Sequence, residues 1–119
     1  MTLHYIGSRY IPRGAAMRPA AATNASVLIM ASLSGGPSHG WAIMNDVLAI
    51  CGVRLGPGTL YAAISDLEAR GLIEALATEG RRRPYRLTDP GQAALLAQLQ
   101  VLQGVVTACA DRLDRKAPS

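Results

Sequence analysis

The sequence has no phenylalanine and few aromatic residues of any kind, with one tryptophan and four tyrosines among 119 residues. Because half of the residues are nevertheless hydrophobic, the core must consist mainly of Ala, Leu, Ile and Val, which favours closely packed helices. A chain of this length is expected to form a single domain with one core, and it is small for an enzyme that encloses its ligand.

Cysteine is scarce as well, and the two that occur, Cys51 and Cys109, lie far apart and form no C-x-x-C pair. This pattern is typical of small buried hydrophobic residues in a reducing compartment. No apolar run reaches the roughly 18 residues that a membrane-spanning helix needs. The arginines near the N-terminus are not followed by the apolar segment of a secretory signal. We therefore expect a cytoplasmic protein with no membrane partner.

Motifs of catalysis and cofactor binding are also missing. The sequence contains no glycine-rich phosphate-binding signature, no paired Cys/His set and no G-x-S-x-G. Asp66 and Glu68 are two residues apart and would point to different sides of a helix. His39 has no second His, Cys or carboxylate at ligand spacing, and a capping or turn-bonding role suits it better. We expect no catalytic residue, no metal and no cofactor.

The stretch from Leu55 to Ile73 predicts one short helix with signals at both ends. Pro57 suits a first helical position because it has no N–H to leave unpaired. Gly71 is expected to end the helix in the left-handed conformation. One face is predicted to be buried because its apolar residues recur at spacings of 4 and 3: Leu60, Ile64 and Leu67. The opposite face is small and almost uncharged, which would let another surface come close: Gly58, Ala62, Ser65 and Ala69.

After Gly71 the period of the pattern changes from 3.6 to 2, which predicts a β-hairpin. Its strands would run over residues 72–77 and 84–87, with a turn at residues 78–80. Three consecutive arginines follow that turn: Arg81, Arg82 and Arg83. A helix followed by a hairpin with a basic tip is the core of a winged helix-turn-helix. The net charge of +4 gathers at this tip and at both ends of the chain, which favours an anionic partner.

Two further helices are predicted ahead of this core. The first would run from a cap at Thr23 or Asn24 through Ser34. The second would run over residues 40–51, with its inner side formed by Trp41, Met44, Val47 and Leu48. A short extended pairing is expected at residues 52–55. Residues 1–23 are expected to form a basic, flexible arm. In the alternative, Tyr5, Ile6, Tyr10 and Ile11 dock on the protein or on a partner subunit.

The last helix is expected to start at Thr88 or Asp89 as cap, with Pro90 in its first turn. Over roughly 25 residues it would be about 37 Å long and would extend beyond so small a domain. Its apolar residues follow a 4-3-4-3-4 spacing: Leu95, Leu99, Leu102, Val106, Cys109 and Leu113. This a/d seam predicts a homodimer. Packing only against the first helix of the same chain is the alternative.

Three blocks of the sequence resemble the signature blocks of PadR-type transcriptional regulators. They are PSHGWAIMNDV, GPGTLYAAISDLEARGLIEA and GRRRPYRLTDPG, and the resemblance covers residues 26–91. It implies a mainly α fold with a small β-hairpin, in which a winged helix-turn-helix over residues 24–88 precedes a long C-terminal dimerisation helix and tail over residues 89–119. Trp41 replaces the usual Tyr at a site expected to be buried, and Pro84 precedes the wing tyrosine. The last helix lacks the aromatic residues with which relatives bind flat drugs.

We therefore expect a sequence-specific DNA-binding transcriptional regulator, a repressor, that binds a two-fold symmetric operator on double-stranded DNA as a homodimer. The expected DNA contacts are Gly58, Thr59, Tyr61, Ala62 and Ser65 of the central helix and Arg81, Arg82, Arg83 and Tyr85 of the hairpin. Two alternatives remain: a winged-helix protein-interaction module without DNA binding, and a MarR-like regulator that senses a small molecule. The existence of a small-molecule effector stays open.

Overall fold

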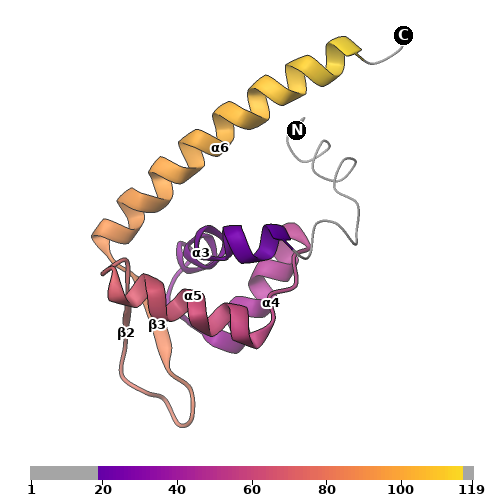
Figure 1. Cartoon of the computed structure of the whole chain (residues 1–119). Coiled ribbons are helices and arrows are strands. Elements are labelled where there is room, and N and C mark those ends of the chain that lie inside the picture. The colour runs from indigo at the N-terminus through magenta and orange to yellow at the C-terminus, as the bar shows by residue number, and fades with distance from the viewer. Residues whose placement is uncertain (1–18, 117–119) are drawn as a thin grey trace.

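The computed structural model describes residues 19–116, with side chains from residue 24 onward. The elements follow in the order α3 (Pro19–Leu33), β1 (Ser38–His39), α4 (Gly40–Cys51), α5 (Pro57–Ala69), β2 (Ile73–Ala75), β3 (Pro84–Leu87) and α6 (Asp89–Lys116). Helices α3, α4 and α5 gather into one body beside a small sheet, and α6 extends away from it (Figure 1). The predicted fold class is confirmed.

Helix α3 begins at Pro19, ahead of the predicted caps Thr23 and Asn24. Proline favours the first turn of a helix, and the three alanines that follow it have the highest helix propensity. The predicted boundary was therefore wrong. The rest of the predicted N-terminal arm, including the docking of Tyr5, Ile6, Tyr10 and Ile11, lies outside the described residues.

The core lies where α3, α4 and α5 meet, and the predicted buried face of α5 is confirmed, with Leu60, Ile64 and Leu67 at most 2% exposed. The predicted inner side of α4 was wrong in part. Trp41 is 65% exposed and Leu48 is 36% exposed, while the buried stripe is Gly40, Ile43 and Val47. Trp41, Met44 and Leu48 have the same i, i+3, i+7 spacing as that stripe, so periodicity could not distinguish the two.

The sheet has the order β1-β3-β2, so β3 is its central strand. Both pairings are antiparallel, with Ser38 opposite Tyr85 in one and Ile73 opposite Leu87 in the other. The pairing predicted for residues 52–55 is made instead by β1. Pro84 is the first residue of β3, and its carbonyl accepts a hydrogen bond from the Leu76 N–H at 2.8 Å. A proline at the start of a strand therefore leaves the ladder intact.

Helix α5 ends in a Schellman motif, the left-handed type of helix end predicted from Gly71. The Gly71 N–H donates to the Glu68 carbonyl, and the Leu72 N–H donates to the Leu67 carbonyl, both at 3.0 Å. Gly71 has φ of +74°, a conformation that side chains disfavour. Leu67 and Leu72 are both buried. The chain therefore leaves α5 in a fixed direction and enters β2.

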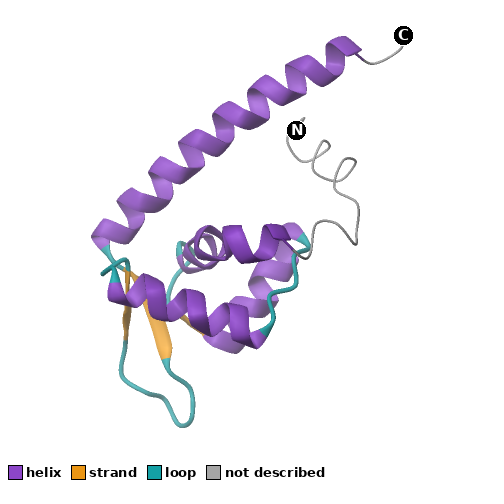
Figure 2. Ribbon diagram, viewed as in Figure 1, coloured by secondary structure: helices purple, strands orange, loops and turns teal. Residues whose placement is uncertain are grey.

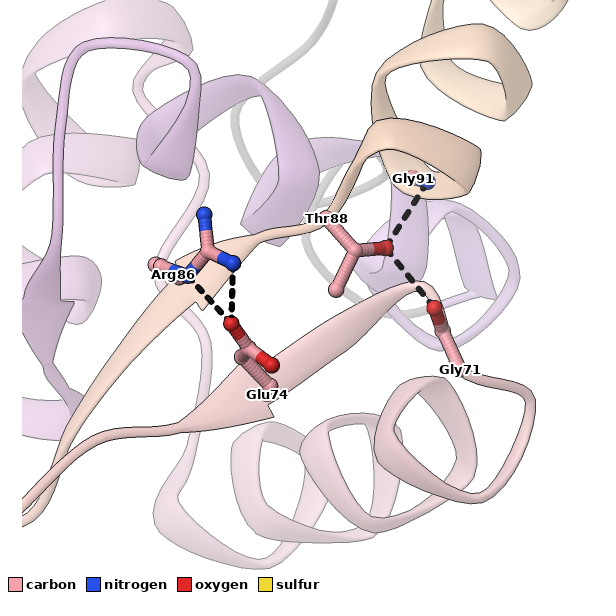
Figure 3. A network of polar contacts seen from close by, with 5 residues as sticks. All are labelled: Gly71, Glu74, Arg86, Thr88 and Gly91. Atoms are coloured by element: carbon pink, nitrogen blue, oxygen red, sulfur yellow. Dashed lines mark hydrogen bonds and ion pairs between the residues drawn. The ribbon is translucent and has the colours of Figure 1, made fainter.

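The start of α6 is tied to the end of α5 (Figure 3). The Thr88 N–H donates to the Leu72 carbonyl at 3.1 Å, and the Thr88 hydroxyl donates to the Gly71 carbonyl at 2.7 Å. The same hydroxyl accepts the Gly91 N–H at 3.1 Å, which confirms Thr88 as the cap of α6. A Cβ atom on Gly91 would overlap the Leu72 carbonyl oxygen and lie 2.8 Å from Cδ1 of Leu87. This junction accepts only glycine at position 91.

We expect Gly91→Ala to lower the free energy of unfolding by about 2 kcal/mol, because the new methyl group meets backbone that cannot move aside without distorting the junction. Gly104→Ala on the same helix is the matched control, since a Cβ there meets nothing within 4 Å. That control should be neutral or stabilise the protein by up to about 1 kcal/mol. Urea unfolding followed by circular dichroism measures both. Equal stability of the two variants would contradict the tight junction.

Candidate nucleic-acid interface

Helix α5 presents one uncovered face along the surface of the body (Figure 1). The predicted small residues of this face are all exposed, and Thr59 beside them is half-buried: Gly58, Ala62, Ser65 and Ala69. Asp66 is paired with Arg70, whose Nη1 lies 2.9 Å from the carboxylate. The predicted face is therefore present, and near its C-terminal end the negative charge of Asp66 is offset.

Tyr61 joins α5 to the start of α4. A Cβ atom on Gly40 would lie 2.5 Å from the Tyr61 hydroxyl oxygen and 3.0 Å from Cζ, so the ring lies directly on the Gly40 backbone. Tyr61 nevertheless remains 52% exposed. Nothing in the periodicity predicted this contact, but the glycine directly before Trp41 is the sequence signal that could have indicated it.

We call residues 76–83 the wing, the loop between β2 and β3 that projects beyond the strands (Figure 2). At its tip the N–H groups of Glu79 and Arg82 donate to each other's carbonyls at 2.8 and 3.0 Å. Gly80, the first central residue of this tight turn, has φ of +63°. Type II′ hairpin turns place glycine there. The turn holds the three arginines at the projecting end of the hairpin.

The wing arginines are exposed, and none of them pairs with a carboxylate within residues 19–116. Arg82 instead has Nη1 3.5 Å from Nε2 of His39. His39 occupies the cap position of α4 but makes no side-chain capping bond, so its predicted capping role was wrong. Arg86, further along β3, pairs with Glu74 of β2 (Figure 3). The unpaired positive charge of the hairpin is therefore confined to the wing.

Tyr85 is 8% exposed and belongs to the core, so its predicted part in DNA contact is not supported. Burial raises the pKa of its hydroxyl above the ordinary value of 10.0, and the negative charge of Glu68 raises it further, while Arg83 opposes both. An alternating strand turns every second side chain inward, and in β3 these are Tyr85 and Leu87. Tyr85 therefore anchors the base of the wing.

The predicted seam of α6 consists of one residue that is buried within the protomer and a longer part that is exposed. Leu95 is 6% exposed and packs in the core of its own protomer, so most of its side chain is already covered without a partner. Beyond it, the side chains are uncovered: Leu99 and Leu102 are each 43% exposed, Cys109 and Leu113 are exposed, and Val106 is half-buried. An open groove of about 440 Å³ at the foot of α6 is continuous with this stripe and is lined in part by Leu33, Pro37, Leu87, Leu95, Leu96 and Leu99.

Helix α6 is also long and apolar enough to cross a membrane, with a mean hydropathy of 1.5 over an 18-residue window that is 6% buried. The sequence expectation concerned unbroken apolar runs, whereas glutamines interrupt the apolar stretch of this helix. Length and composition alone do not distinguish a membrane span from an uncovered interface helix.

Among the residues with described side chains, no three His, Cys, Asp or Glu lie together as metal ligands.

The family model of the transcriptional regulator PadR-like family matches residues 29–97. Two curated relatives are 43% identical to this chain: an uncharacterised 37.1 kDa protein in transposon Tn4556 of Streptomyces fradiae, over 72 residues, and the transcriptional regulator Rv3488 of Mycobacterium tuberculosis, over 68 residues. These matches cover 60% and 55% of this chain. They cover 21% and 63% of those proteins, so the chain spans less than two thirds of either.

A solved structure gives the same fold. It is a PadR family transcription regulator from Clostridium difficile, which superposes with a TM-score of 0.68 at 23% identity. The superposition covers 76% of this chain and 98% of that one. The fold of this chain therefore has a counterpart of known architecture.

The burial of Tyr85 makes stability depend on pH in the alkaline range. Because the folded-state pKa is raised, the folded protein holds this proton more tightly than the unfolded chain does. The stabilisation is complete below the unfolded pKa and is lost as pH rises through the folded pKa. We expect the melting temperature to fall less between about pH 9 and pH 11 in Tyr85→Phe than in the wild type. Identical profiles in thermal melts would contradict this account of Tyr85.

Proposed function

Because the chain belongs to the transcriptional regulator PadR-like family, as its three sequence blocks predicted, we propose that it is a cytoplasmic, sequence-specific DNA-binding repressor. It would act as a homodimer on a two-fold symmetric operator. The observation that carries this proposal is the uncovered small-residue face of α5 beside a wing with three arginines that pair with no carboxylate in residues 19–116. A helix and a basic hairpin on one body match the major groove and the flanking phosphates of a duplex.

Helix α5 is the part that would enter the major groove. Gly58 and Ala62 have almost no side chain, so the helix backbone can approach the base edges closely and touch thymine methyl groups. Ser65 can exchange one hydrogen bond with a base. This face has no Arg, Lys, Asn or Gln, the side chains that make bidentate contacts to guanine or adenine. Specificity would therefore depend on thymine positions, half-site spacing and DNA shape.

Helix α6 is the part that would join two protomers. Three exposed leucines follow the heptad spacing of helices that pair in water: Leu99, Leu102 and Leu113. Leu96, Val101 and Val105 are exposed as well and widen this stripe. The remaining side of α6 carries polar residues, whereas a membrane span is apolar all round. The interruption of the apolar stretch by Gln98, Gln100 and Gln103 supports the same choice, because unpaired amides are costly in hydrocarbon. A second protomer seated on this stripe would also cover the groove at the foot of α6.

The salt dependence of DNA binding shows whether the wing arginines contact phosphates. Each phosphate contact contributes about 0.9 to the slope of log K against log salt. Changing Arg81, Arg82 and Arg83 together to Ala should flatten that slope by roughly two to three units, measured by fluorescence anisotropy on duplex DNA from the protein's own promoter region. Changing Arg112, Arg115 and Lys116 to Ala removes the same charge at the far end of α6 and should leave the slope nearly unchanged.

Equal slopes in both triple variants would show that the wing does not contact DNA. An absence of salt-sensitive binding by the wild-type protein would contradict the proposed function itself. That result would favour the alternative of a protein-interaction module, in which the hairpin binds another protein and the arginines serve solubility.

The proposed dimer can be tested by substituting seam residues of α6 that are exposed in the protomer and do not belong to its core. Leu99→Asp with Leu102→Asp should give folded monomers in analytical ultracentrifugation, because buried carboxylates at both positions would repel each other across the interface. Ala97→Asp with Gln100→Asp adds the same charge to the opposite side of α6 and should leave the dimer intact. A seam variant that remains dimeric would place the interface elsewhere.

A further inference from the structure

The only tryptophan of the chain, Trp41, is exposed and is not part of the hydrophobic core. Trp41 lies in the first turn of α4 and is 65% exposed, although the sequence pattern predicts it on the inner side. Singly exposed apolar residues are common on protein surfaces and need no function. Trp41 differs from such residues because the two residues before it in the chain contact a hydroxyl donor, Tyr61, and a positive charge, Arg82.

Two side chains from other elements, Tyr61 and Arg82, contact the residues directly before Trp41. The residue before Trp41 is Gly40, on which the ring of Tyr61 from α5 lies. The residue before that is His39, which pairs with Pro84 at the start of β3 and has Arg82 of the wing 3.5 Å from its Nε2 atom. Trp41 therefore lies beside the meeting point of α4, α5 and the base of the wing.

The groups at this point suit a phosphate. The indole N–H is a donor only, the guanidinium of Arg82 is a donor with a positive charge, and the Tyr61 hydroxyl can donate. The first turn of α4 has no acidic residue. The planar indole ring can also pack against a deoxyribose. Sugars and phosphates form the DNA backbone, which flanks a helix in the major groove on both sides.

We propose that Trp41, together with Tyr61 and Arg82, contacts the phosphate–sugar backbone of DNA along the edge of the major groove that α5 enters. This inference rests on the proposed DNA-binding function. It adds a contact from α4 that neither the recognition face of α5 nor the three wing arginines supply. Because a backbone contact carries no base information, Trp41 would contribute to affinity on every sequence and position α5 in the groove.

The wild-type chain contains its own probe, since Trp41 is its only tryptophan. Titration with a labelled promoter duplex is followed in parallel by anisotropy of the label and by tryptophan emission. The proposal expects both signals to change with the same midpoint. Anisotropy that reports binding while the emission stays constant would overturn the proposal and leave the proposed function standing. An emission that responds to protein concentration and not to DNA would assign Trp41 to a protein–protein contact.

Variants separate a backbone contact from a structural role. Trp41→Ala should weaken binding about tenfold on promoter and scrambled duplexes alike, because it removes a ring contact and a hydrogen bond to a charged group. Trp41→Phe keeps a ring and should lose less. Since the indole is neutral, the slope of log K against log salt should stay unchanged in both, whereas Arg82→Ala should lower it by about 0.9.

Ile50→Ala is the matched control, because Ile50 is 57% exposed on the last turn of the same helix. It should bind like the wild type. Thermal unfolding of each variant checks that the fold is kept, which an exposed side chain allows. If Trp41→Ala binds as tightly as Ile50→Ala, Trp41 does not touch the backbone. A loss of binding confined to the promoter duplex would likewise overturn a backbone contact.

Discussion

The carbonyl group of Leu72 is the point on which the arrangement of this molecule depends. It follows the Schellman end of α5, it accepts the N–H of Thr88, and it lies so close to Gly91 that no side chain fits there. Thr88 in turn hydrogen-bonds Gly71 and caps α6 (Figure 3). Backbone contacts of this kind leave little freedom of rotation. The end of α5, the base of the hairpin and the start of α6 therefore form one rigid unit.

This rigidity has a consequence for how the two ends of the molecule would cooperate. The core of the protomer ends at Leu95, and the rest of α6 leaves the body as an uncovered apolar stripe. In our proposal the stripe joins two protomers, and the junction at Leu72 then fixes the direction of each α5 relative to the shared axis. A recognition face with few base-specific side chains gains most from such geometry, because spacing between half-sites can replace direct readout.

The sequence predicted those features that local signals encode. Pro57 and Gly71 mark both ends of α5, and Thr88 with Pro90 marks the start of α6, because helix caps depend on residues only a few positions apart. Features that depend on distant contacts were missed. The burial of Gly40 rather than Trp41 is set by Tyr61, and the pairing of β1 with β3 joins segments more than 40 residues apart. Likewise, Leu95 and Leu99 share one periodic stripe, and their different burial depends on where α6 leaves the core, which periodicity does not show.

The central claim is that two copies of α5, held at a fixed separation, read one duplex. Hydroxyl-radical footprinting on the promoter region, combined with the mass of the complex from ultracentrifugation, tests this claim most directly. The account predicts two protomers on each duplex and two protected blocks related by two-fold symmetry. Their centres should lie roughly 10 base pairs, or a multiple of this, apart. A single protected block occupied by one protomer would contradict it.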